Sequence, residues 1–303
     1  METDLRETNR VRGLMKPLTL YADMANWIDL AEERVDSGPL ENAIAGGRVV
    51  PVLSLVHLLE LAANANTAGR DRVADYMESL RAVGPFKWIQ HYREVIRREA
   101  TACFKAFGDR WESPVVFFDS FHETLPDADP QIIMTVGEGM PRRISEMVDV
   151  LPRSEAFRKY LDDCRDYPQF RRRIVSIRRA RKAEKRFTDT EKRSWLAELV
   201  PGHVNMTFGL VPVGDDLRKK FAESVDLSRC PAFRASWAFH EGANLDPKGA
   251  RKGDIPDLWH LTGVAYSDVA FADKRTVEVL RKGAYDKLPQ RNSEFSGWVR
   301  SLA

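Results

Sequence analysis

The chain has 303 residues, 43% of them hydrophobic, so it can bury a substantial core as one elaborated domain or as two modest ones. Its 47 basic and 45 acidic residues leave a formal net charge of +2, so overall charge does not indicate a polyanion partner. The cysteines Cys103, Cys164 and Cys230 are odd in number and lack CxxC spacing, which argues against a disulfide framework and a thiolate zinc site.

Localisation is predicted from two segments. The first ten residues are too polar and too acidic for a secretory leader. The longest nearly apolar stretch, residues 49–63, is interrupted by His57 and Glu60 and is shorter than the ~20 residues that span a bilayer. We therefore expect a soluble globular protein in the cytoplasm with no membrane partner.

The first predicted element is a buried strand over residues 18–22, which runs directly into Asp23 and is followed by a helix from Trp27. This strand therefore ends in a carboxylate. A second buried strand is predicted over residues 49–53. Its internal Pro51 favours an edge position or an early strand end, because proline has no N–H to give to a neighbouring strand.

The next predicted helix begins at Leu55, is capped by Ser54 and is apolar on nearly every side. Glu60 lies inside it, either facing solvent or buried among leucines. A buried, unpaired carboxylate costs roughly several kcal/mol and persists only if it is paired, protonated or bound to a cation. His57, one turn from Glu60, is interpreted as a packed, hydrogen-bonded neighbour and not as a ligand.

The middle of the chain, residues 71–232, changes to charged helical stretches that are broken repeatedly at proline and glycine. We interpret it as a mostly helical insertion between two halves of an α/β core, residues 18–70 and 233–285. The last residues, 286–303, predict no clear element and are treated as a C-terminal tail.

One basic run stands out in that insertion. Residues 171–186 carry nine basic residues and a single acid, Glu184. Arg178, Arg179 and Arg181 are its candidate nucleic-acid contacts, because neutralising phosphates releases counterions and favours binding. A solvated helix face, or a surface for an acidic protein partner, explains the run equally well.

The segment from Gly253 to Lys274 contains four acids, all of them aspartates. Asp254 and Asp257 lie at the head of a predicted helix, where we assign Asp254 to capping and Asp257 to a site. Asp268 lies at the turn before a buried strand over residues 269–272, and Asp273 follows that strand directly. His260, one turn from Asp257, is interpreted as a packed neighbour.

The carboxyl ends of parallel strands and the amino ends of the helices that follow them share one edge of a sheet. We therefore expect Asp23, Glu60, Asp257 and Asp273 to converge there. Carboxylates within ~4–6 Å repel one another unless a divalent cation neutralises them, and all-oxygen ligation suits Mg²⁺ or Mn²⁺. Such a site can activate water for phosphodiester hydrolysis.

The four acidic segments LYADMANWI, SLVHLLEL, DIPDLWHL and YSDVAFADK resemble, in the same order, those of the PIN-like nuclease family. The resemblance covers roughly residues 18–70 and 233–280. It implies a three-layer α/β/α fold with a central parallel sheet, and metal-dependent endonucleolytic cleavage of RNA or, less often, DNA. It assigns catalysis and metal binding to these residues: Asp23, Glu60, Asp257 and Asp273, with Asp268 as an auxiliary metal ligand.

Next to this site, Lys274 and Arg275 are placed to meet a scissile phosphate, or are ordinary surface residues. The chain departs from the family pattern at Ala272, where a hydroxyl residue is common, and at Met24 and Ala25, where small polar residues are common. Asn26 is a candidate substitute for them.

These departures keep a second hypothesis open: a catalytically degenerate PIN-like module that binds RNA or a protein partner. A phosphatase of the haloacid dehalogenase type is disfavoured, because it needs an aspartate where this chain has Ala25. The sequence leaves open whether the chain forms a homo-oligomer.

Overall fold

The structure is a computed structural model that describes residues 16–108, 112–124, 143–153, 157–158, 161–162, 172, 186–246, 251 and 253–303. A six-stranded sheet in the order β4-β3-β2-β1-β7-β8 forms its centre. Its neighbouring strands are parallel except β3 and β4, which are antiparallel. The strands are β1 (Leu18–Tyr21), β2 (Val49–Ser54), β3 (Lys87–Ile89), β4 (Phe117–Phe118), β7 (Val269–Ala272) and β8 (Gln290–Arg291).

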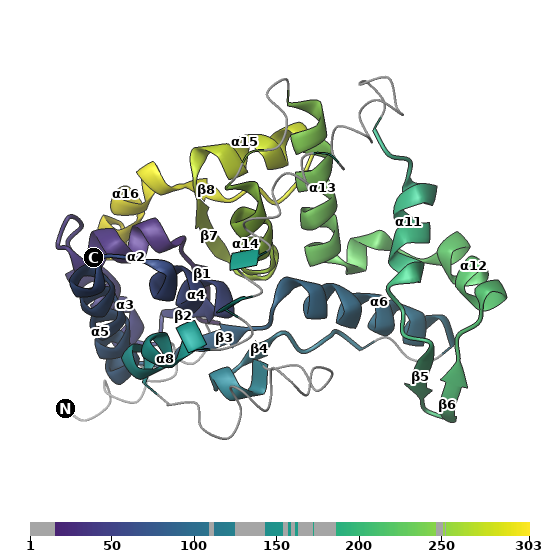
Figure 1. Ribbon diagram of the computed structural model, residues 1–303, viewed down its shortest axis with the longest axis horizontal. Coiled ribbons are helices and arrows are strands. Elements are labelled where there is room, and N and C mark those ends of the chain that lie inside the picture. The colour runs from purple at the N-terminus through teal and green to yellow at the C-terminus, as the bar shows by residue number, and fades with distance from the viewer. Residues whose placement is uncertain are drawn as a thin grey trace, which may run out of the picture.

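Helices cover both sides of this sheet. Figure 1 shows α2, α3 and α5 on one side and α13 and α14 on the other, and the contacts of α3 with β2 and of α14 with β2 and β7 agree. The chain is thus an α/β protein whose layers fit a three-layer α/β/α architecture. The helices of this core are α2 (Met24–Ala31), α3 (Gly38–Ala45), α4 (Leu55–Ala63), α5 (Thr67–Val83), α13 (Pro231–Leu245), α14 (Asp254–Tyr266), α15 (Lys274–Lys282) and α16 (Phe295–Arg300).

The second strand does not lie at the edge of the sheet, so the expectation drawn from Pro51 was wrong. β2 pairs with β1 on one side and with β3 on the other, and all six of its residues are buried. A proline removes only one donor from the ladder, whereas burying the apolar run VVPVL stabilises the interior position.

The segment 71–232 is mostly helical in its described parts, but it also contains four short strands that the sequence analysis did not predict. Two of them, β3 and β4, extend the central sheet. The other two, β5 (His203–Met206) and β6 (Gly209–Pro212), form a separate antiparallel hairpin. Most of α5 lies in this segment, and its further helices in the described residues include α6 (Tyr92–Gly108), α8 (Ile144–Val150), α11 (Asp189–Glu198) and α12 (Asp215–Ser224). In Figure 1, α6 leads from the sheet to a lobe formed by α11, α12 and the hairpin.

The residues treated as a tail also belong to the fold. β8 pairs in parallel with β7, and α16 packs against α3. Phe295 and Val299 of α16 are buried, and the Phe271 ring in β7 meets the Phe295 ring edge-on. The signal was missed because β8 has two residues and α16 has six, too few for a periodic pattern.

The strand order reverses direction at β1, since β2 and β3 follow on one side of it and β7 and β8 on the other. Crevices at such a switch point, outside the carboxyl ends of the strands, are where open α/β sheets bind ligands. Gly263 lets α14 lie directly on β1 there, because a Cβ at this position would overlap the Tyr21 ring. His260, one turn earlier on α14, is thereby brought to the end of β1.

Candidate metal centre

Two aspartates close neighbouring strands at this edge of the sheet. Asp23 follows β1 and is half-buried, and Asp273 follows β7, also half-buried. Asp273 caps α15, since the Thr276 backbone N–H donates a 2.6 Å hydrogen bond to its Oδ1. Asp23 precedes α2 without a side-chain capping bond, so its carboxylate is not committed to the helix.

The Asp23 carboxylate is held from the C-terminal part of the chain instead. Asn292 Nδ2 donates a 2.7 Å hydrogen bond to Asp23 Oδ2, and the buried Asn26 donates a 2.9 Å bond to Asn292 Oδ1. Asn26 is thus connected to Asp23 through Asn292. It orients Asn292, which orients Asp23.

Three groups come close enough to share one ion. Asp23, Glu60 and His260 each offer a ligand atom, and these atoms all lie within 4.8 Å of one another. His260 Nε2 lies 3.2 Å from Glu60 Oε1, yet Nε2 and the second Glu60 oxygen, Oε2, are buried without a hydrogen-bond partner. Buried polar atoms are normally hydrogen-bonded, so these two atoms stand out among the described residues.

Asp257 lies on the same helix as His260, three residues earlier, and therefore shares its face. Burial raises its pKa well above the ordinary value, and the neighbouring Asp273 and Asp23 carboxylates act in the same direction. The Thr276 side chain and His260 act against them. Asp257 is thus electrostatically coupled to both Asp273 and Asp23, whereas the ligand atoms within 4.8 Å of one another belong to Asp23, Glu60 and His260.

A chain of hydrogen bonds supports His260 from behind. Its Nδ1 lies 2.6 Å from the Tyr21 hydroxyl, which lies 3.0 Å from Ser54 Oγ, which in turn lies 3.0 Å from His57 Nδ1. Burial would lower the pKa of His260, but Tyr21 and the Glu60 carboxylate outweigh it, and the pKa is raised well above its usual range. Burial raises the pKa of Tyr21, so the phenol keeps its proton.

His57 is fully buried and structural, as the sequence analysis expected. Its Nε2–H donates 2.9 Å to the Ala22 carbonyl, and its Nδ1 accepts 3.0 Å from the Ser54 backbone N–H. Burial, helped by the nearby His260, lowers its pKa to about 3, so the ring is neutral. His57 therefore ties the start of α4 to the residue that precedes Asp23.

Asp254 does not cap its helix, contrary to the expectation. Its Oδ2 accepts 2.8 Å from the Arg251 backbone N–H, outside the helix, and its carboxylate pairs with Arg275 at 3.1 Å. Arg275 also forms an ion pair with Asp246, which is buried like Asp254. Burial raises the pKa of Asp254 to about 6. Arg275 thus neutralises buried carboxylates and is not presented to a phosphate.

The remaining predicted contacts lie elsewhere. Asp268 Oδ2 accepts 2.9 Å from the backbone N–H of Thr19 and 2.8 Å from its hydroxyl, at the opposite end of β7 from Asp273. Asp268 therefore links the start of β7 to β1, and it lies away from the cluster of Asp23, Glu60 and His260. Lys274 has a side chain that is 74% exposed and lies 3.9 Å from Glu278, so it is the basic candidate left at this edge.

Arg178, Arg179 and Arg181 lie outside the described residues. Within the described parts of the chain, no helix combines the length and the apolar character needed to cross a bilayer.

Two cavities flank α6. The first, about 430 Å³, lies between α6, α11, α13 and α14 and is bordered by aromatic rings, by Arg93 and by Leu258, the neighbour of Asp257. Its rings belong to Tyr92, Phe187, Trp195, Phe233 and Trp237.

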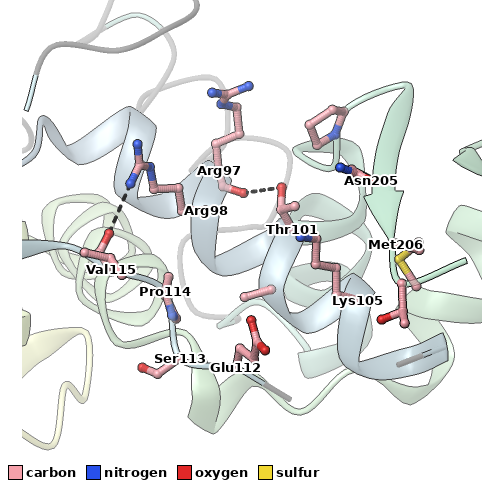
Figure 2. Close-up of a pocket in the computed structure, with 13 residues that line it drawn as sticks. Arg97, Arg98, Thr101, Lys105, Glu112, Ser113, Pro114, Val115, Asn205 and Met206 are labelled. Atoms are coloured by element: carbon pink, nitrogen blue, oxygen red, sulfur yellow. Dashed lines mark hydrogen bonds between the residues drawn. The ribbon is translucent and has the colours of Figure 1, made fainter. Parts of the chain in front are cut away.

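The second cavity, about 570 Å³, is the more polar one. Figure 2 shows Arg97, Arg98 and Lys105 on α6, with Asn205 and Met206 of β5 across the space. Arg97 and Arg98 both bond Glu94, and Glu112 also borders the cavity, so much of its positive charge is offset.

The sequence analysis missed two residues of this centre. His260 had a usable signal, since a spacing of three residues from Asp257 on a helix places both side chains on one face. Asn292 had none, because 269 positions separate it from Asp23 and the strand that precedes it, β8, has only two residues.

A scan against protein-family models finds none that matches the chain, and searches of curated proteins and of solved structures return no match either.

Proposed function

We propose that the protein is a metal-dependent endoribonuclease of PIN-like type. One observation carries the proposal: Asp23, Glu60 and His260, from three separate segments, place ligand atoms within 4.8 Å of one another. Asp257 and Asp273 add two carboxyl groups that are electrostatically coupled to each other. Such a set is unfavourable without a cation, and Mg²⁺ or Mn²⁺ fits its oxygen-rich composition.

In this proposal each residue has a role that follows from its position. Asp23, Glu60 and Asp257 would hold the ion, and Asp273 would complete the acidic edge while it caps α15. A bound divalent cation would activate water and offset the negative charge that develops on the phosphate oxygens. Asn292 and Thr276 keep Asp23 and Asp273 in place, so the carboxylates need little reorganisation when substrate arrives.

The aromatic cavity supports single-stranded RNA as the substrate. Aromatic rings stack unpaired bases of any identity, and a nearby cation can follow the phosphates. Trp195 is 45% exposed beside this cavity, and Leu258 joins its lining one residue from Asp257. A strand bound there would pass close to the acidic centre. The segment 71–232 would then shape the substrate groove through α6 and α11.

The test is a cleavage assay on single-stranded RNA, with a DNA strand of the same sequence as the second arm. We expect RNA cleavage with Mn²⁺ or Mg²⁺, none with EDTA, and a loss of roughly 100-fold or more in Asp23→Asn and Asp257→Asn. Both variants should keep the wild-type circular dichroism spectrum. If both variants cleave RNA as fast as the wild-type protein, the nuclease assignment is refuted. Tight RNA binding without any turnover would favour the degenerate RNA-binding module.

A further inference from the structure

We propose that His260 is itself a metal ligand, and that its imidazole makes the centre prefer first-row transition-metal ions such as Mn²⁺ over Mg²⁺. The inference rests on the metal centre of the proposed function and names which ions that centre selects. It reverses the sequence-based interpretation of His260 as a packed neighbour. Three observations carry it.

The first observation is geometric. Ligand atoms lie roughly 2.0–2.2 Å from Zn²⁺ and similar ions, so two of them are at most about 4.4 Å apart. The atoms offered by Asp23, Glu60 and His260 lie within 4.8 Å of one another. Small side-chain movements are therefore enough to place all three on one ion.

The second observation is that the atoms facing this space are unsatisfied. His260 is 8% exposed, and its Nε2 has no hydrogen-bond partner; Glu60 Oε2 is buried and also lacks one. Nε2 and Glu60 Oε1 form an ion pair at 3.2 Å that is not aligned as a hydrogen bond, so the hydrogen-bonding capacity of Nε2 is not fully used. A buried polar atom without a hydrogen-bond partner indicates that a bound ligand supplies the missing interaction.

The third observation is the hydrogen-bond chain behind the ring, which ends on an acceptor. His57 donates from Nε2 to the Ala22 carbonyl, so its neutral ring has an unprotonated Nδ1. The hydrogen bonds can therefore run from His260 Nδ1–H to the Tyr21 hydroxyl, from Tyr21 to Ser54 Oγ, and from Ser54 to His57 Nδ1, which the Ser54 hydroxyl shares with the Ser54 backbone N–H.

In that direction one His260 proton lies on Nδ1, and Nε2, which faces Glu60, is the nitrogen at which a cation would take the place of a proton. Metal-binding histidines characteristically donate their other ring N–H to a fixed acceptor, which sets the tautomer and the ring orientation. Tyr21 fills this position in a fully buried setting, held by the contact of α14 with β1 at Gly263.

The nitrogen ligand decides the choice of metal. Mg²⁺ takes oxygen ligands in a strict octahedron and gives up its water reluctantly, whereas imidazole suits the transition metals. A centre with one imidazole and several carboxylates therefore gains affinity for Mn²⁺ and related ions but little for Mg²⁺.

The experiment uses Mn²⁺ as the probe and reads binding, not cleavage. Pulsed electron paramagnetic resonance of the full-length protein with one equivalent of Mn²⁺ should show the ¹⁴N coupling of a directly bound imidazole. In His260→Gln this coupling should vanish. Calorimetry should show Mn²⁺ binding weakened by about 10- to 100-fold and Mg²⁺ binding by less than about threefold. His203→Gln, an exposed histidine in β5, is the matched control and should match wild type.

Absence of ¹⁴N coupling in the wild-type protein with Mn²⁺ bound overturns the proposal, and this measurement needs no variant to fold. Equal Mn²⁺ affinity of a folded His260→Gln protein also overturns it. The proposed function can fail separately. If Mn²⁺ is coordinated by nitrogen but RNA is not cleaved, His260 is a metal ligand and the nuclease hypothesis is wrong. If Mn²⁺ supports cleavage but shows no nitrogen coupling, the nuclease hypothesis stands and His260 is not a metal ligand.

Discussion

Asn292 donates a 2.7 Å hydrogen bond to Asp23 across 269 positions of the chain. The first acid of the centre is thus oriented by a residue between the last strand, β8, and the last helix, α16. Its other contact, with the buried Asn26, locks the amide so that its NH₂ group faces the carboxylate. The C-terminal residues are therefore part of the candidate site.

We predict that Asn292→Leu weakens Mn²⁺ binding by roughly 10- to 100-fold while the fold is retained, because partners that orient metal ligands typically contribute that much. Isothermal titration calorimetry measures the affinity, and Ser293→Ala, an exposed neighbour, is the control. A variant that binds Mn²⁺ as tightly as wild type would show that Asp23 needs no support from Asn292.

The half-buried acid Asp257 predicts an unusual dependence of stability on pH. Burial, reinforced by Asp273 and Asp23, raises its pKa well above the ordinary 3.8, so the folded protein retains a proton that the unfolded chain releases. Asp257 therefore costs no stability below pH 3.8, and its cost grows as pH rises from there through the folded pKa. In EDTA, we expect Asp257→Asn to have a higher melting temperature than wild type at pH 8, with little difference at pH 4.

Added metal should reverse that order at pH 8. A ligand that binds only the folded state stabilises it in proportion to the logarithm of its concentration above Kd, and Asp257→Asn lacks one of the carboxylates that hold it. Scanning calorimetry with 5–10 mM Mn²⁺, roughly, and with EDTA gives both comparisons. If Asp257→Asn melts below wild type in EDTA at pH 8, the carboxyl group is stabilising and the cluster is not poised for a cation.

The fold could be predicted from the sequence where single segments carry strong local patterns. β1, β2, β7 and α4 are predominantly apolar, and each forms the element that its pattern predicts. The prediction failed where structure depends on distant pairing. β3, β4 and β8 have two or three residues each and form because the sheet offers them partners.

For the site, too, the local sequence pattern was informative and the long-range contacts were not. Strand ends and helix starts share an edge of a parallel sheet, which led us to expect the acids together. Asp23 and Glu60 do offer ligand atoms within 4.8 Å of each other, and Asp257 is electrostatically coupled to Asp273 and Asp23. The partners of the neighbouring acids were not predictable. That Asp254 bonds Arg275 and Asp268 bonds Thr19 follows from the crossing of α14, α15 and β1 in space, which no local pattern encodes.

Asp268 provides a matched control within the same acidic segment. Its carboxylate is bonded to Thr19 at the far end of β7, so we predict that Asp268→Asn leaves RNA cleavage and Mn²⁺ affinity within about twofold of wild type. The loss of the Thr19 bonds should lower the free energy of unfolding by about 1 kcal/mol. Urea denaturation measures that cost. A loss of metal affinity in this variant would restore Asp268 as a ligand.

Trp195 tests the substrate groove independently of the metal. We predict that Trp195→Ala weakens binding of a single-stranded RNA by ~1–3 kcal/mol in EDTA, since one aromatic stack contributes about that much per base. Phe208→Ala removes another exposed ring, 71% exposed at the tip of the β5–β6 hairpin and away from this cavity, and should bind normally. Fluorescence anisotropy of a labelled oligonucleotide gives both affinities, and equal losses would point to non-specific effects.

Asp273 has two roles that a pair of substitutions can separate. Its Oδ1 caps α15 through the Thr276 N–H, and its charge acts on Asp257. Serine caps a helix about as well as aspartate but brings no carboxylate, whereas alanine does neither. We therefore predict that Asp273→Ser keeps the wild-type stability and loses cleavage, and that Asp273→Ala loses cleavage and also about 1 kcal/mol of stability. Urea denaturation and the RNA assay, run on both variants, give the four values. If Asp273→Ser cuts RNA like wild type, the carboxylate serves only as a cap, and the reactive centre reduces to Asp23, Glu60, Asp257 and His260.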